Sequence, residues 1–219
     1  MIRAVLFDLD GTLTDSRPGI VNCFRHAFAR LAEAGGPSVS LPHDEDLRFI
    51  VGPPLRDSFA RFAGEDEKER LMDFYLERYQ PIGAFENSVY EGVAAALDLI
   101  AASGARLYVA TSKNERDANA ILRHFGLAGR FASINGARLD GSRGAKHELI
   151  GDILATHALQ AEEAAMIGDR EFDMIGAKSL GVAAIGALWG YGTPEELIAA
   201  RADALAATPL EAAEIALRR

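Results

Sequence analysis

The chain has 219 residues, a formal net charge of -9 at pH 7 and a single cysteine, Cys23. This length suffices for one large α/β domain or for a core domain with a smaller insertion. The acidic balance argues against a nucleic-acid or anionic-membrane partner, because such binding needs clustered lysine and arginine. One cysteine allows no internal disulfide and no thiolate metal cluster, and we expect it to be a buried apolar residue. No apolar stretch is long enough to span a bilayer and no signal-peptide pattern opens the chain, so we expect a cytoplasmic protein.

The first expected element is a strand, the apolar run Ala4–Phe7, which leads directly into two aspartates, Asp8 and Asp10. An apolar run stopped by Gly11 predicts a buried strand of a parallel sheet with both acids at its carboxyl end. In open α/β sheets this edge binds ligands. Residues two apart lie on the same side of an extended backbone, so both carboxylates face the space beyond the strand.

These two acids predict a specific chemistry. Carboxylates this close repel each other unless a cation or a shared proton offsets them, and a hard cation such as Mg²⁺ takes oxygen ligands and substrate phosphates. With a metal holding Asp8 ionised, its free oxygen can attack phosphorus and form an acyl phosphate. Asp10 can protonate the departing oxygen and later deprotonate the water that resolves the intermediate. An isolated Asp-x-Asp is usually a solvated turn or a helix cap, but its place between an apolar strand and Gly-Thr favours the catalytic interpretation.

An inserted helical domain is predicted next, because helical patterns without a core strand fill the chain from Asp15 to about Ile82. The helices are expected over residues 18–34, around Leu47, after Pro53-Pro54 and over residues 68–79. We expect an all-α domain of residues 15–83 inserted into a core of residues 1–14 and 84–219. Two linkers, Asp15-Ser16-Arg17 and residues 83–89, make a hinge plausible.

Four further apolar runs alternate with helical patterns after the insertion, over residues 106–111, 131–134, 164–168 and 182–186. Strands that alternate with helices predict a parallel sheet, and each intervening helix has one apolar face to lay on it. Gly104, Gly126 and Gly181 follow these helices, where a left-handed residue is favoured. The expected fold class is therefore α/β, with a Rossmann-like parallel sheet, helices on both faces, and a smaller all-α cap domain inserted after the first strand.

The second of these strands carries polar residues at its end. Thr111, Ser112, Lys113 and Asn114 precede a helix expected to begin near Glu115. A hydroxyl and backbone N–H groups at a helix start can hold a phosphate. Ser112 or Asn114 can equally cap the helix, and the two roles are compatible.

Two more acids, Asp169 and Asp173, stand at and after the end of the run 164–168. Asp169 is a candidate further metal ligand. Asp173 lies one helical turn on and can reach the same site directly, through water, or by orienting a neighbour. The alternative is that both acids cap and charge-balance the start of a helix.

Lys146 stands in what reads as a loop entering a helix that begins near His147. A lysine there would balance the carboxylates and hold a phosphate oxygen as a point charge. The alternative is a solvated lysine.

Taken in order, these segments resemble the haloacid dehalogenase superfamily, in particular its phosphoglycolate-phosphatase-like members with a helical cap. The resemblance covers nearly the whole chain. The motifs that carry it are Asp8-x-Asp10-Gly11-Thr12, then Thr111-Ser112, then Lys146, and then Gly168-Asp169 with Asp173.

The resemblance implies a role for each of these positions. Asp8 is expected to be the nucleophile and Asp10 the general acid and base, with Thr111 and Lys146 on the transferring phosphoryl group. Mg²⁺ is expected to be held by the Asp8 carboxylate, the Asp10 backbone carbonyl and Asp169. Asp173 is expected beside the metal ligands. Four further residues are expected to bind the substrate: Gly11, Thr12, Ser112 and Lys113.

The insertion contains a stretch, residues 49–56, that is similar to the cap loop which closes over the substrate in such phosphatases. Arg48 and Arg56 are then candidate contacts for an anionic leaving group. Surface arginines on cap helices are the alternative.

The leading hypothesis is a Mg²⁺-dependent phosphatase that hydrolyses a small-molecule phosphomonoester, such as a phosphoglycolate-like compound, a sugar phosphate or a nucleotide, as a monomer or homodimer. A sugar phosphomutase of the same superfamily and a non-catalytic metabolite-binding module are the alternatives. A dehalogenase is disfavoured, because it needs neither a second acid nor a metal, and this chain offers both Asp10 and Asp169.

Overall fold

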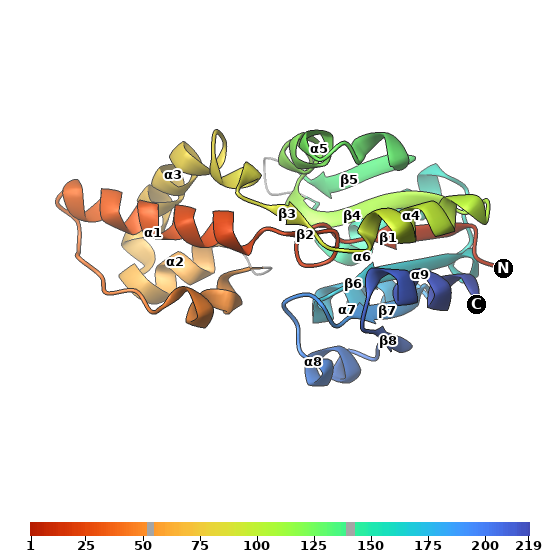
Figure 1. Cartoon of the computed structure of the whole chain (residues 1–219). Coiled ribbons are helices and arrows are strands. Elements are labelled where there is room, and N and C mark those ends of the chain that lie inside the picture. Colours follow the sequence, from red (N-terminus) through yellow and green to blue (C-terminus); the bar gives the residue numbers. More distant parts are fainter. Residues whose placement is uncertain (52–54, 139–142) are drawn as a thin grey trace. The chain divides into compact units, whose positions relative to one another are not determined.

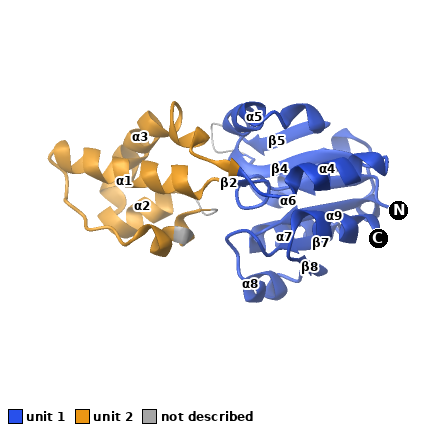
Figure 2. Cartoon of the chain, viewed as in Figure 1, with its two compact units in different colours: residues 1–15, 89–219 blue, residues 16–88 orange. Residues whose placement is uncertain are grey.

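The computed structural model describes residues 1–51, 55–138 and 143–219, apart from the side chain of Arg48. The expectations placed on Gly52-Pro53-Pro54 and on Gly141-Ser142 lie outside the described residues. The chain divides into two units, one of residues 1–15 and 89–219 and one of residues 16–88 (Figure 2). The sequence predicted an insertion of residues 15–83, so both of its predicted ends precede those in the structure. Residues 83–85 form a short 3₁₀ helix that contacts the first helix of the smaller unit.

A six-stranded parallel sheet lies at the centre of the larger unit (Figure 1). Its strands, in spatial order, are β5 (Ser133–Ala137), β4 (Arg106–Asn114), β1 (Ala4–Phe7), β6 (Ala164–Gly168), β7 (Ala183–Ala187) and β8 (Ala204–Ala206). Every neighbouring pair in this sheet is parallel, which confirms the predicted sheet type. The strand β8 was not predicted, because three residues without a β-branched side chain give no strand pattern.

Helices cover both faces of this sheet (Figure 1). They are α4 (Val93–Ala102), α5 (Glu115–His124), α6 (Lys146–Thr156), α7 (Glu171–Ser179), α8 (Pro194–Ala199) and α9 (Pro209–Leu217), with 3₁₀ turns at Ala128–Arg130 and Ala161–Glu163. A buried cluster joins the sheet to α6 and α7 through Leu6, Tyr108, Ile150, Met166 and Met174. On the other face α4 packs against α9. The predicted Rossmann-like core is thereby confirmed.

The smaller unit contains only helices and turns among its described residues, apart from one residue of a short strand. They are α1 (Arg17–Glu33), α2 (Leu55–Ala63) and α3 (Lys68–Tyr79), with 3₁₀ helices at Asp44–Ile50, Glu65–Glu67 and Gly83–Phe85. The rings of Phe24 and Phe59 stack at a centroid distance of 4.9 Å in its core. The predicted burial of Cys23 is confirmed. Two short strands, β2 (Thr14–Asp15) and β3 (Ser88–Val89), pair where the chain leaves and re-enters the larger unit.

The parallel register brings three strand ends to one edge of the sheet. Phe7, the last residue of β1, is level with Val109 of β4 and with Ile167 of β6. The residues that follow these positions therefore come together beyond the carboxyl ends of the strands. Among the described residues, no helix combines the length and apolar character needed to cross a bilayer.

Candidate active site

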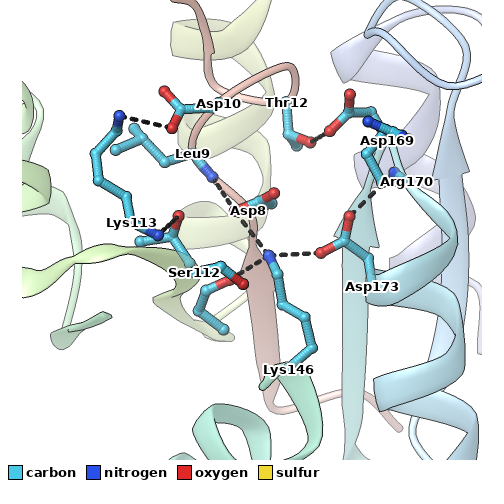
Figure 3. Close-up of polar contacts among 12 residues, drawn as sticks. Asp8, Leu9, Asp10, Thr12, Ser112, Lys113, Lys146, Asp169, Arg170 and Asp173 are labelled. Atoms are coloured by element: carbon cyan, nitrogen blue, oxygen red, sulfur yellow. Dashed lines mark hydrogen bonds and ion pairs between the residues drawn. The ribbon is translucent and has the colours of Figure 1, made fainter. Parts of the chain in front are cut away.

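Asp8 stands at the end of the central strand with one oxygen held and the other available. Its backbone N–H donates to the Ile167 carbonyl of β6 at 3.0 Å. Its Oδ1 accepts the Leu9 N–H at 2.7 Å and lies 2.7 Å from Nζ of Lys146 (Figure 3). The described residues place no donor on Oδ2. The carboxylate is thus fixed through one oxygen, and the second remains free to react.

Lys146 is the first residue of α6, one residue before the helix start expected near His147, and it is buried, so the alternative of a solvated lysine is wrong. Its Nζ lies 2.7 Å from Asp8 Oδ1 and 2.6 Å from Asp173 Oδ1, and donates to the Ala110 carbonyl at 2.9 Å. The side chain is 4% exposed. Burial alone would lower the pKa of Lys146, but the negative charges of Asp173 and Asp8 outweigh it and raise that pKa. The lysine therefore stays charged between the two acids.

Asp169 is held by donors on both of its oxygens. Its Oδ1 accepts the Thr12 hydroxyl at 3.1 Å, and its Oδ2 accepts the Tyr191 N–H at 2.8 Å. Burial, together with the charges of Asp173 and Asp8, raises the pKa of Asp169 well above its ordinary value. The side chain is fully buried. Its orientation is therefore set by the protein before any ligand arrives.

Asp8, Asp169 and Asp173 form a cluster that fits a hard cation. One carboxylate oxygen from each lies within 4.8 Å of the others, and all three residues are buried. Burial is the main cause that raises the pKa of Asp8 to about 6, opposed by Lys146 and reinforced by Asp173. Three buried carboxylates beside one lysine leave excess negative charge, which an oxygen-seeking divalent cation such as Mg²⁺ offsets. The residues present therefore fit the expected metal.

Asp10 is the second acid of the pair and has a partner of its own. Its Oδ2 lies 2.8 Å from Nζ of Lys113, and both side chains are largely buried. Its Oδ1 is buried and has no hydrogen-bond partner among the described residues. The turn that follows needs Gly11, whose φ of +84° is unfavourable for other residues. Asp10 therefore offers one unpaired acceptor at the same strand end as Asp8.

The end of β4 carries the next set of predicted residues. Thr111 is buried and its Oγ1 accepts the Lys113 N–H at 3.3 Å. The Ser112 hydroxyl donates to the Gly144 carbonyl at 2.9 Å. Asn114 caps α5 by accepting the Asp117 N–H at 2.9 Å, as the capping interpretation predicts.

The structure brings most of the predicted site residues of the larger unit together. Asp8, Lys146, Asp169 and Asp173 form one connected set; Asp10 pairs with Lys113; and Thr12 bonds to Asp169 (Figure 3). Arg56 lies in the smaller unit, where its guanidinium donates twice to Glu69 at 2.9 and 3.1 Å. The side chain of Arg48 lies outside the described residues.

Sequence reasoning missed the loop after β7, residues 188–192. The Trp189 indole N–H donates to the Thr12 carbonyl at 2.9 Å, and Tyr191 supplies the main-chain donor to Asp169 described above. The signal was Trp-Gly-Tyr-Gly at the end of a predicted strand, on the edge where the acids lie. Two glycines there allow close approach of the backbone, and two aromatic side chains supply polar donors.

The chain is similar to a family of hydrolases and to several individual proteins. A family model described as haloacid dehalogenase-like hydrolase matches residues 5–187. The chain is 42% identical over 195 residues to a 5′-nucleotidase of Pseudomonas aeruginosa, covering 88% of this chain and 86% of that protein. It is 33% identical over 193 residues to a phosphoglycolate phosphatase of Xanthomonas campestris, covering 86% and 84%.

The chain also resembles a protein that is named as a tyrosine kinase and a protein of known structure. The chain is 40% identical over 190 residues to tyrosine-protein kinase PtkA of Mycobacterium tuberculosis, and this match spans 87% of the chain but only 63% of that protein. A crystal structure described as a predicted phosphatase from Clostridium acetobutylicum matches with a TM-score of 0.90 and 35% identity over 100% of both chains.

Proposed function

We propose, from the premise that the chain belongs to the haloacid dehalogenase-like hydrolases, that it hydrolyses a small-molecule phosphomonoester through an aspartyl-phosphate on Asp8. The family, together with relatives named as a 5′-nucleotidase and a phosphoglycolate phosphatase, supports a hydrolase that acts on phosphate esters. The aspartyl-phosphate mechanism rests on the hydrogen bonding of the Asp8 carboxylate. Its Oδ1 is anchored by Leu9 N–H and Lys146, while Oδ2 has no donor among the described residues.

The first step follows from that asymmetry. Oδ2 of Asp8 attacks phosphorus, a bond forms between them, and the bond from phosphorus to the leaving oxygen breaks. Lys146 holds Oδ1 throughout, so the nucleophile keeps one orientation. Thr111, at the end of β4, contributes to the phosphate-binding edge together with the backbone at the start of α5. Asp8, Asp169 and the Asp10 backbone carbonyl would hold Mg²⁺, which would supply positive charge to offset the negative charge of the phosphoryl group.

Asp10 is the general acid in the first half of the reaction and the general base in the second. Lys113 holds its Oδ2, which leaves Oδ1 as the oxygen free to exchange a proton. Asp10 gives a proton to the departing alkoxide in the first step. It then takes a proton from the water that attacks the aspartyl-phosphate, and the bond from phosphorus to Asp8 breaks to release inorganic phosphate.

Replacing the nucleophile tests this proposal. Asp8→Asn keeps the size of the side chain but removes the nucleophilic oxygen, so turnover of an aryl phosphate should fall by at least about 1,000-fold. Asp98→Asn is the matched control, because Asp98 is an exposed aspartate of α4. The control should retain full activity. An Asp8→Asn variant with undiminished turnover would contradict the mechanism.

The acceptor of the phosphoryl group distinguishes hydrolysis from its alternatives. We propose water as the acceptor, and a panel of glycolate, sugar and nucleotide phosphates should release inorganic phosphate in the presence of Mg²⁺. An isomerised sugar phosphate would indicate the phosphomutase instead, and phosphotyrosine on a protein would indicate the activity named for the mycobacterial relative. Binding without any product would indicate a non-catalytic module.

A further inference from the structure

The loop of residues 188–192 holds the turn that follows the catalytic acids. This strap, as we name these five residues, runs from the end of β7 across the turn of residues 11–15. The Trp189 indole donates to the Thr12 carbonyl at 2.9 Å, while the Thr12 hydroxyl donates to Asp169 at 3.1 Å. Thr12 is therefore fixed from two sides, by the strap and by the proposed metal ligand.

Glycine at two positions of the strap brings its backbone against Asp169. A Cβ on Gly190 would lie 2.3 Å from the Asp169 Cβ and 2.4 Å from the Gly11 carbonyl oxygen. A Cβ on Gly192 would lie 2.0 Å from the Asp169 carbonyl oxygen. No side chain fits in either place. The close approach allows the N–H of the residue between them, Tyr191, to reach Asp169 Oδ2 at 2.8 Å.

The side chain of Tyr191 makes a second link from the same residue. Its hydroxyl donates to Oδ1 of Asp15 at 2.9 Å, and both residues are half-buried. Asp15 is the last residue of the larger unit before the chain enters the smaller one at Ser16. A hydrogen bond from a hydroxyl to a carboxylate is stronger than a hydrogen bond between two neutral groups. One residue therefore bonds to the proposed metal ligand through its main chain and to the outgoing linker through its side chain.

We propose that Tyr191 is a positioning residue that keeps the outgoing linker ordered relative to Asp169. The kinetic part of this inference rests on the proposed phosphatase function. If the hydroxyl is removed, Asp169 keeps its main-chain donor, so the chemical step is preserved. The linker at Asp15 loses one of its bonds and becomes less ordered, so part of its order must be regained when substrate binds, which weakens binding. Loss of the hydroxyl should therefore raise KM and leave kcat nearly unchanged.

Tyr191→Phe is the direct test, because it deletes only the hydroxyl. Hydrogen exchange of backbone amides in residues 14–17 should become about tenfold faster, as expected for the loss of one bond to a charged acceptor. With an aryl phosphate and Mg²⁺, KM should rise about threefold to tenfold while kcat stays within about twofold. Unchanged exchange in these residues would overturn the proposal, whatever the enzyme activity proves to be. A variant that is merely misfolded would instead lose kcat at constant KM.

Matched variants separate the specific bond from a general effect. Tyr108→Phe is the control, because its hydroxyl is buried and has no hydrogen-bond partner among the described residues. It should leave linker exchange unchanged. Asp15→Ala should lose at least as much protection as Tyr191→Phe, and the double variant should be no worse than Asp15→Ala alone. Asp15→Asn retains an acceptor and should restore most of the protection. Additive effects of Asp15→Ala and Tyr191→Phe would contradict the proposed bond.

These outcomes keep the two proposals apart. Hydrogen exchange measures linker order without substrate and does not depend on catalysis. An active Asp8→Asn variant would contradict the phosphatase mechanism, but the hydrogen-exchange result for Tyr191→Phe would remain valid. Unchanged exchange in Tyr191→Phe would remove the positioning role and leave the nucleophile unaffected.

Discussion

Nζ of Lys146 lies 2.7 Å from Oδ1 of Asp8, and this contact is buried at the carboxyl edge of the sheet. The same nitrogen also contacts Asp173 at 2.6 Å. One positive charge thus stabilises two acids, one of them the proposed nucleophile. Removing that charge affects both the fold and the chemistry.

Lys146→Met should destabilise the larger unit and abolish most activity. It keeps an unbranched side chain of nearly the same length but leaves Asp8 and Asp173 buried without their partner, which costs about 3–5 kcal/mol. We expect the melting temperature to fall by at least about 6 °C and kcat/KM by at least about 100-fold. Lys68→Met is the control, because its partner Glu65 is exposed, and it should shift neither quantity measurably. Equal melting temperatures for the two variants would contradict a buried structural charge.

Metal binding should depend on pH through the buried acids. Burial raises the pKa of Asp8 from 3.8 to about 6, so folding favours its protonated form. In metal-free protein this contribution to stability is fully present below pH 3.8 and is lost as pH rises through about 6. The proposed Mg²⁺ site requires the ionised carboxylates, so its affinity should rise with pH across the same window and binding should release protons.

Calorimetry at two pH values measures that dependence. Titration of Mg²⁺ at pH 7.5 should give tighter binding than at pH 5.5, and heats in buffers of different ionisation enthalpy should reveal proton release. Asp169→Asn should remove most of the affinity, whereas Asp98→Asn should keep it. Affinity that is the same at both pH values would contradict a site built from Asp8 and Asp169.

Gly192→Ala should disrupt the proposed metal site without replacing a charged residue. Its new Cβ would lie 2.0 Å from the Asp169 carbonyl oxygen, so the backbone of Asp169 or of the strap must move. We expect Mg²⁺ affinity to fall by at least about tenfold, measured by the same titration. Gly129→Ala has open space at its Cβ position and should bind Mg²⁺ as the unaltered protein does.

The positions of the candidate catalytic acids could be predicted from the sequence because they depend on local patterns. An apolar run ending at Asp8 and another ending before Asp169 both predict strands, and parallel strands place their carboxyl ends at one edge. The predicted strand 164–168 and helix 68–79 agree with β6 and α3. Local periodicity decides such elements before any tertiary contact forms.

Features that depend on distant partners could not be predicted in the same way. Lys146 resembles a solvated residue in the sequence, because the groups that hold it come from β1, β4 and α7. Tyr191 meets Asp169 and Asp15 only after the sheet has formed. The strand β8 has little strand propensity of its own and is ordered by pairing with β7.

The most direct test of the central claim uses Asp10→Asn with an aryl phosphate. Aryl oxide leaves without a proton, so Asp8 can still be phosphorylated, but no base activates water to resolve the intermediate. Rapid-quench measurement should show a burst of about one equivalent of phenol per protein followed by slow turnover. Borohydride reduction of the quenched protein should then convert residue 8, and no other, to homoserine in the peptide mass spectrum. Release of phenol without a burst, or reduction at another residue, would contradict an aspartyl-phosphate on Asp8.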